Sequence, residues 1–188
     1  MDGVSRAAEQ PRTALSAMLA GIALVAGVVG LLWFAPYSYS VFKALHVVAI
    51  VIWVGGDVTL TTLGIVFERR GDSDTLAAIG KLGAWIGPRL YTPAAFAVFA
   101  FGAALVEKGS WGWGVVWIDL ALAGWAIATG VGVLFVGPEL GRIDRAAEAL
   151  GPQSEEVARR VRRLFTVFRF DTVLLLLIVF DMTAKPTF

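Results

Sequence analysis

Few residues in this sequence could do chemistry inside an apolar environment. The chain has one histidine, His46, and no cysteine. Other charged side chains lie within or at the edges of long apolar stretches: Asp57, Arg89, Asp119, Arg169, Asp171, Asp181 and Lys185. Charged groups are costly in lipid, so those that occur there usually face the interior of a helical bundle, where they pair or act. These positions are the candidates for function.

His46, Trp53 and Asp57 share one side of a predicted helix. At 100° per residue, Trp53 and Asp57 fall within about 20° of His46 on either side. Neutral imidazole is a common ligand of haem iron, zinc and copper. His46 is therefore a candidate metal ligand, with Trp53 beside it. A hydrogen-bonded interior histidine and a proton-relay residue are two further interpretations of the same pattern.

The remaining charged positions predict a polar interior. Arg89 opens the membrane part of one predicted helix in WIGPRLYTP, Arg169 and Asp171 lie near the start of the last one, and Lys185 lies just past its far end. Both arginines are near the same predicted membrane boundary, so an Arg89–Asp171 or an Arg169–Asp57 ion pair is feasible. Such pairs either fix helix packing or form part of a polar pathway.

The elements that must position these residues are apolar helices. The chain has 188 residues, of which 57% are hydrophobic and 16% charged, against about 45–50% and ~25% in soluble domains. Each of five apolar segments reaches the ~20 residues that cross a bilayer. The segments are about 14–34, 40–67, 82–106, 113–137 and 164–182. We expect an all-α, polytopic membrane bundle of five transmembrane helices, embedded in a lipid bilayer.

Composition also excludes several classes of function. A net charge of +1 gives no reason to expect nucleic acid as a partner, and the lack of cysteine excludes disulfides, thiolate metal sites and Fe–S ligation. The apolar run at 14–34 exceeds the roughly 7–15 residues of a signal-peptide core, so we interpret it as a retained helix. Gly and Ala at a spacing of four, as in Ala17-Gly21 and Gly124-Ala128-Gly132, predict close helix packing.

The loops predict an orientation. Eleven Lys and Arg residues lie on one side of the predicted membrane: Arg6, Arg12, Arg69, Arg70, Lys81, Arg142, Arg145, Arg159, Arg160, Arg162 and Arg163. Three lie on the other: Lys43, Lys108 and Lys185. Positive charge is retained on the cytoplasmic side. We therefore expect the N-terminus, including a tail over 1–13, in the cytoplasm and the C-terminus outside.

The one long connection, at about 138–163, is charged and helix-prone. Its sequence GPELGRIDRAAEALGPQSEEVARRVRR is broken at Gly151-Pro152, and Ser154 followed by Glu155 is typical of a helix start. A cytoplasmic helical hairpin with its arginines near anionic headgroups is one interpretation, and a docking site for a partner is the other.

Four stretches together resemble a known group of membrane proteins: KALHVVAIVIWVGGD, WIGPRLYTPAAF, VGPELGR and FRFDTVLLLLIVFDMTAKP. They are similar to a bacterial family of predicted integral membrane proteins of unknown function, related to the copper-resistance protein CopD and to HemJ, a protoporphyrinogen oxidase. The resemblance covers about 41–188 and implies a four-helix membrane core, to which the helix at 14–34 is an addition. It also implies location in the bacterial cell (inner) membrane.

The resemblance implies roles for particular residues. His46 matches the family histidine that is implicated in haem binding in HemJ. Arg89 lies in the family's Gly-Pro-Arg segment, Arg169 and Asp171 lie in its Arg-x-Asp start of the last helix, and Lys185 lies in its closing Lys-Pro. Copper fits the residues less well than haem, because copper favours soft Met and Cys or several His ligands.

Three hypotheses of function follow. The first is a haem- or porphyrin-associated redox protein that binds haem b through His46 beside Trp53; with one histidine per chain, two histidine ligands would require a homodimer. The second is a small-solute or ion permease whose polar interior contains Asp57, Arg89, Arg169 and Asp171. The third is a non-catalytic subunit of a larger membrane complex. The sequence assigns no enzymatic reaction.

Overall fold

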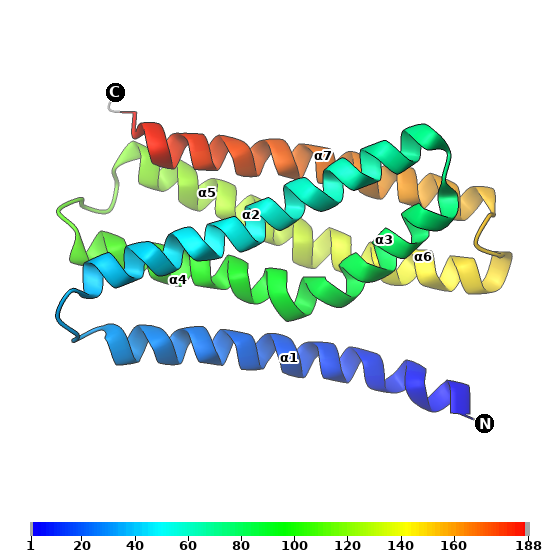
Figure 1. The fold of residues 1–188 in the computed structure, drawn as a ribbon, viewed down its shortest axis with the longest axis horizontal. Coiled ribbons are helices and arrows are strands. Elements are labelled where there is room, and N and C mark those ends of the chain that lie inside the picture. Colours follow the sequence, from blue (N-terminus) through cyan, green and yellow to red (C-terminus); the bar gives the residue numbers. More distant parts are fainter. Residues whose placement is uncertain (1, 187–188) are drawn as a thin grey trace. The chain divides into compact units, whose positions relative to one another are not determined.

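In the part that the structure describes, the chain consists of helices joined by short connections (Figure 1). The structure is a computed structural model that describes the backbone of residues 2–186 and, Ser73 apart, the side chains from Ala14 onward; Arg6 and Arg12 lie outside the described side chains. No strand occurs in residues 2–186, which confirms the all-α prediction. The helices are α1 (Asp2–Leu32), α2 (Ser38–Arg70), α3 (Ser73–Ile86), η1 (Gly87–Tyr91), α4 (Thr92–Lys108), α5 (Val116–Gly130), η2 (Val131–Val136), α6 (Gly137–Leu150) and α7 (Glu155–Ala184).

Within the described residues, four helical stretches are long and apolar enough to cross a membrane: Ala14–Leu32, Ser38–Arg70, Asp74–Lys108 and Val116–Leu150. The first four predicted spans are among them. Helix α7 is not, because Arg169, Asp171 and Asp181 interrupt its apolar half. The helices also extend past the apolar segments from which they were predicted, since a helix continues beyond the membrane wherever its residues favour one.

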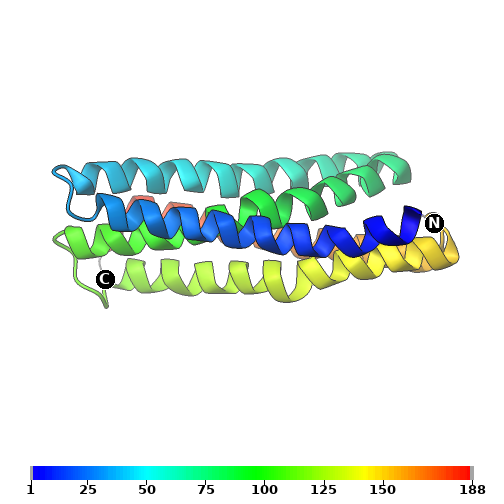
Figure 2. The ribbon, with the colours of Figure 1, turned by 90° about the horizontal axis from the view of Figure 1, so that it is seen from below.

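The chain forms two compact units, and α2 contributes to both. The first unit comprises the chain up to Trp53 together with Trp85–Trp113, and so contains α1, the first half of α2, η1 and α4. Its core is built from buried Phe42, Ala49, Ala97, Phe101 and Ala104. Helix α1 lies along α4 (Figure 2).

The second unit comprises Val54–Ala84 and the chain from Gly114 onward. Helices α5 and α7 lie side by side in it (Figure 1), and α6 also packs on α7. Glycines allow two of its close approaches: a Cβ on Gly124 would lie 2.6 Å from Ile178, and one on Gly64 would lie 2.0 Å from Phe165. The Ala/Gly spacing therefore predicts the contact at Gly124 correctly.

Each unit contains a π-helical turn that is followed, two residues after its end, by a proline. In η1 the N–H of Thr92 donates to the carbonyl of Gly87, and the next residue is Pro93. In η2 the N–H of Gly137 donates in the same i→i−5 pattern, and the next residue is Pro138. A proline cannot donate to the helix, and its ring crowds the carbonyl four residues earlier. The wider turn accommodates each proline without ending the helix.

The turn between α2 and α3 contains a helix cap. The Asp72 carboxylate accepts a hydrogen bond from the Thr75 hydroxyl at 2.7 Å and one from the Thr75 backbone N–H at 3.0 Å. These two bonds, the hydroxyl bond first, lower the pKa of the Asp72 carboxyl from its usual value of 3.8. The ionised carboxylate therefore stabilises the start of α3.

This cap makes stability depend on pH. Because the pKa of Asp72 is lowered in the folded state, its contribution is complete above the unfolded pKa and is lost as pH falls through the folded one. We expect Asp72→Ala to lower the midpoint of thermal unfolding in detergent at pH 7, and its difference from wild type to shrink below about pH 4. Asp72→Asn should keep much of the cap. A deficit of Asp72→Ala that is constant from pH 7 to pH 3 would contradict this assignment.

Candidate functional site

His46 is held rigidly inside the first unit. The side chain projects from α2 and is 7% exposed. Its Nδ1 lies 2.9 Å from the backbone carbonyl oxygen of Val98 on α4. Because a carbonyl oxygen only accepts, Nδ1 must carry the hydrogen and donate. The neutral ring then has its lone pair on Nε2, and this buried atom has no hydrogen-bond partner among the described residues.

Small residues make room for the imidazole ring. A Cβ on Gly102 would lie 3.1 Å from Cε1 of His46 and 3.4 Å from its Nδ1, so any larger residue would press on the ring. One turn before His46, Phe42 is fully buried and stacks on Phe101 at a ring-centroid distance of 6.2 Å. The ring is thus fixed among apolar side chains. A buried polar atom without a hydrogen-bond partner is rare in folded proteins.

Trp53 lies on the same face of α2 as His46, two turns further along. It is half-buried and is the last residue of the first unit's part of α2. Asp57, the third member of the predicted stripe, belongs to the second unit. His46 and Trp53 therefore belong to the first unit, and Asp57 belongs to the second.

Asp57 belongs to a hydroxyl–carboxylate cluster in the second unit. It accepts a hydrogen bond from the hydroxyl of Thr172 on α7, and this hydroxyl also lies 3.0 Å from that of Thr61. Thr61 is 3% exposed. Beside Thr172, the Oδ1 atom of Asp171 is buried and has no hydrogen-bond partner in the described part of the chain. Two carboxyl groups therefore lie on facing elements of one apolar unit.

Arg169 does not pair with Asp57, and the interpretation that joins them is wrong. Its guanidinium forms an ion pair with Glu68 near the end of α2 instead. Arg89 belongs to the first unit, where Nη1 donates to the Trp85 carbonyl at 3.0 Å and the guanidinium lies 4.9 Å from the Trp85 ring centroid. Asp171 belongs to the second unit.

Lys185 ends α7 in a left-handed conformation with φ 45°, and its backbone N–H donates to the Asp181 carbonyl at 2.8 Å. Its Nζ lies 5.3 Å from the centroid of the Trp117 ring. A cation over an aromatic face is stabilised by the ring quadrupole. Lys185 thus fastens the end of α7 to α5.

Sequence reasoning misses the partners of these residues. Val98 contributes only a backbone carbonyl, which carries no sequence signal, and Gly102 contributes only an absent side chain. Thr172 could have been found, because it directly follows Asp171 at the start of the apolar run. Glu68 could not have been chosen over Asp57 as the partner of Arg169, because both are acidic residues of α2.

The donor set fits haem better than a metal held by protein ligands alone. Among the residues whose side chains the structure describes, no group of three or more His, Cys, Asp or Glu side chains could hold a metal ion. A haem brings four nitrogen ligands of its own and needs only an axial protein ligand. The imidazole with Nδ1–H on a backbone carbonyl and Nε2 unpaired has the orientation seen in metal-ligating histidines. The unpaired Nε2 of His46 could supply one axial nitrogen, and the missing Cβ at Gly102 gives room to the imidazole ring that carries it.

Comparison with known proteins places the chain in a family. No curated protein and no solved structure matches it. The family described as predicted integral membrane protein (DUF2269) matches residues 40–186. The match begins in α2 and leaves α1 outside it. Since the match covers most of the chain, including both units' parts of α2 and all later helices, the chain belongs to the DUF2269 family of predicted integral membrane proteins.

Proposed function

We propose that this protein is a haem- or porphyrin-associated membrane redox protein in which His46 Nε2 is an axial ligand of haem b. One observation carries the proposal: the His46 ring is fixed through Nδ1 to Val98, yet its buried Nε2 has no hydrogen-bond partner among the described residues. Leaving a buried polar atom unpaired costs about 1–3 kcal/mol, so the arrangement indicates a ligand. The resemblance to CopD and HemJ supports the same assignment.

The chain's own residues would orient and shield the bound group. Val98 fixes the tautomer of His46, Gly102 leaves room for the ring, and Trp53 would line the haem pocket. Haem would supply one-electron exchange, and the apolar surroundings would tune its potential. Because the chain has one histidine, ligation by two histidines requires a homodimer that pairs His46 with His46.

The proposed setting is a bacterial inner membrane crossed five times, with the N-terminus cytoplasmic. As an integral membrane protein the chain contacts lipid. The fifth span would be α7, in which Arg169 pairs with Glu68. Asp171 lies next to Thr172, and its buried Oδ1, like Oδ2 of Asp181, has no hydrogen-bond partner among the described residues. A transmembrane helix can carry charged side chains when these are paired inside the protein.

Absorption spectroscopy tests the proposal. We expect the protein, purified from cells supplied with a haem precursor, to show a Soret band that shifts on reduction with dithionite. The band should be absent in His46→Ala and in His46→Gln, which keeps a donor for Val98 but is a poor iron ligand. Gly102→Ala should retain His46 yet shift the band or lower haem occupancy, because the added Cβ presses on Cε1. A wild-type protein without haem, or equal bands in all variants, would contradict the proposal.

A permease is the second candidate, and the Asp57–Thr172–Thr61 cluster favours it. The two carboxyl groups of Asp57 and Asp171 lie in an apolar unit, where they can bind a proton or a cation on its way across the membrane. Proton flux into liposomes should then fall in Asp57→Asn and be unaffected in His46→Ala. A role as subunit of a larger complex would instead give co-purifying proteins that neither substitution removes.

A further inference from the structure

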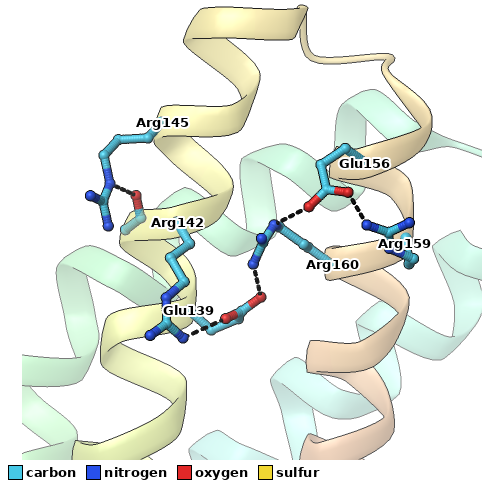
Figure 3. Close-up of polar contacts among 7 residues, drawn as sticks. Glu139, Arg142, Arg145, Glu156, Arg159 and Arg160 are labelled. Carbon is cyan, nitrogen blue, oxygen red and sulfur yellow. Dashed lines mark hydrogen bonds and ion pairs between the residues drawn. The ribbon is translucent and has the colours of Figure 1, made fainter.

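The end of the second unit formed by α6 and α7 holds a network of arginines and glutamates (Figure 3). Glu139 is 1% exposed, and its two carboxylate oxygens accept from Arg142 at 3.0 Å and from Arg160 at 2.8 Å. Glu156 accepts from Arg160 at 2.7 Å and also pairs with Arg159. The two carboxylates therefore hold three guanidinium groups in fixed positions. Each guanidinium has five N–H donors, so donors remain for another acceptor.

A cavity of about 220 Å³ opens beside this network. Its lining consists of Glu139, Glu156, Arg159, Arg160 and Arg163. The volume is far above the roughly 10–15 Å³ that one water molecule needs. The cavity thus has room for a polar group of several heavy atoms.

The lining carries a surplus of positive charge. It consists of three arginines and two glutamates, which leaves a formal charge of +1. Arg163 makes no ion pair within the described chain; its guanidinium lies 5.2 Å from the centroid of the Phe135 ring. An anion in the cavity would balance this surplus, and guanidinium groups match phosphate oxygens in geometry.

The cavity lies where apolar chain gives way to charged chain. The apolar run of α5 and η2 ends at Val136, three residues before Glu139, and the apolar part of α7 begins at Leu164, directly after Arg163. In a membrane protein this change of composition marks the level of the lipid headgroups. Basic pockets between helices at that level bind lipid phosphates.

We infer that the cavity between α6 and α7 binds the phosphate group of an anionic phospholipid. The glutamates position the arginines, and Arg159, Arg160 and Arg163 supply donors to the phosphate. The neighbouring apolar residues, among them Phe135, would contact the acyl chains, which a soluble phosphate lacks. The inference is independent of haem binding by His46.

The test uses the full chain in a neutral detergent, with phosphatidylglycerol as the probe and phosphatidylcholine as the uncharged comparison. Native mass spectrometry counts the lipids retained. We expect wild type to retain phosphatidylglycerol in preference, and Arg163→Gln to bind it about ten-fold more weakly, because a charge-assisted hydrogen bond is lost. Arg145→Gln, in α6, is the matched control because it also removes one positive charge. Arg145 donates to the Gly141 carbonyl and does not line the cavity. Its affinity should stay within two-fold of wild type.

Two results would overturn the inference. Equal weakening in Arg145→Gln and Arg163→Gln would mean that only overall charge attracts the lipid. Displacement of phosphatidylglycerol by millimolar inorganic phosphate would assign the cavity to a soluble phosphate. Thermal unfolding midpoints of both variants, measured in the same detergent, show whether each variant is folded.

Discussion

Gly64→Ala is expected to lower the free energy of unfolding by about 3 kcal/mol, the upper end of the usual cost of overpacking. A Cβ on Gly64 would lie 2.0 Å from Cε1 and 2.4 Å from Cδ1 of Phe165. Phe165 cannot swing away into solvent, because it is 3% exposed and packs edge-on against Phe168 at a centroid distance of 5.9 Å. Either α2 or α7 must therefore move, and the core of the second unit loosens.

Gly55→Ala is the matched control for this prediction. Gly55 lies on the same helix, and a Cβ there would meet no atom within 4 Å. Alanine favours a helix over glycine by about 1 kcal/mol, so this variant should be as stable as wild type or more so. Equilibrium unfolding in mixed micelles measures both. Phe165→Leu in the Gly64→Ala background should restore part of the loss, and equal stability of the two alanine variants would contradict the packing at Gly64.

Glu139→Ala is expected to destabilise the second unit by about 2 kcal/mol. Removing one partner of a buried ion pair typically costs 3–5 kcal/mol. The cost is lower here because Arg142 and Arg160 are 53% and 31% exposed and can be hydrated once the carboxylate is gone. The same unfolding measurement applies.

Glu148→Ala, on the exposed part of α6, controls for the loss of an acidic residue. Glu148 makes no ion pair among the described residues, so its replacement should change stability by less than about 0.5 kcal/mol. If Glu139→Ala proves as harmless as Glu148→Ala, Glu139 does not join α6 to α7.

The sequence predicts the helices well because hydrophobic length is a property of the chain itself. The apolar runs correctly predict α1, α2 and the spans that contain α4 and α5. His46, the single histidine, is buried. The spacing of small residues finds Gly21 and Gly124 as contact points, where a Cβ would meet Pro93 and Ile178. It also marks Gly132, where a Cβ would meet nothing within 4 Å, since spacing alone does not tell which face has a neighbour.

The partners of the polar residues are less predictable because they depend on register between helices. Arg169 pairs with Glu68, three helical turns along α2 from Asp57, and nothing in the order of residues selects one acidic partner over the other. The partner of His46 is the Val98 carbonyl, and every residue has a carbonyl. Only the three-dimensional packing of α2 on α4 identifies it.

Isotope labelling tests the central claim, that His46 binds haem iron, most directly. Because His46 is the only histidine, protein grown with ¹⁵N-histidine and purified through a histidine-free tag carries the label at that residue alone. Pulsed EPR of the oxidised, haem-bound protein should show ¹⁵N hyperfine coupling to the iron, distinct from the ¹⁴N of the porphyrin, and none in His46→Gln. Bound haem without ¹⁵N coupling, or a protein that binds no haem, would contradict the claim.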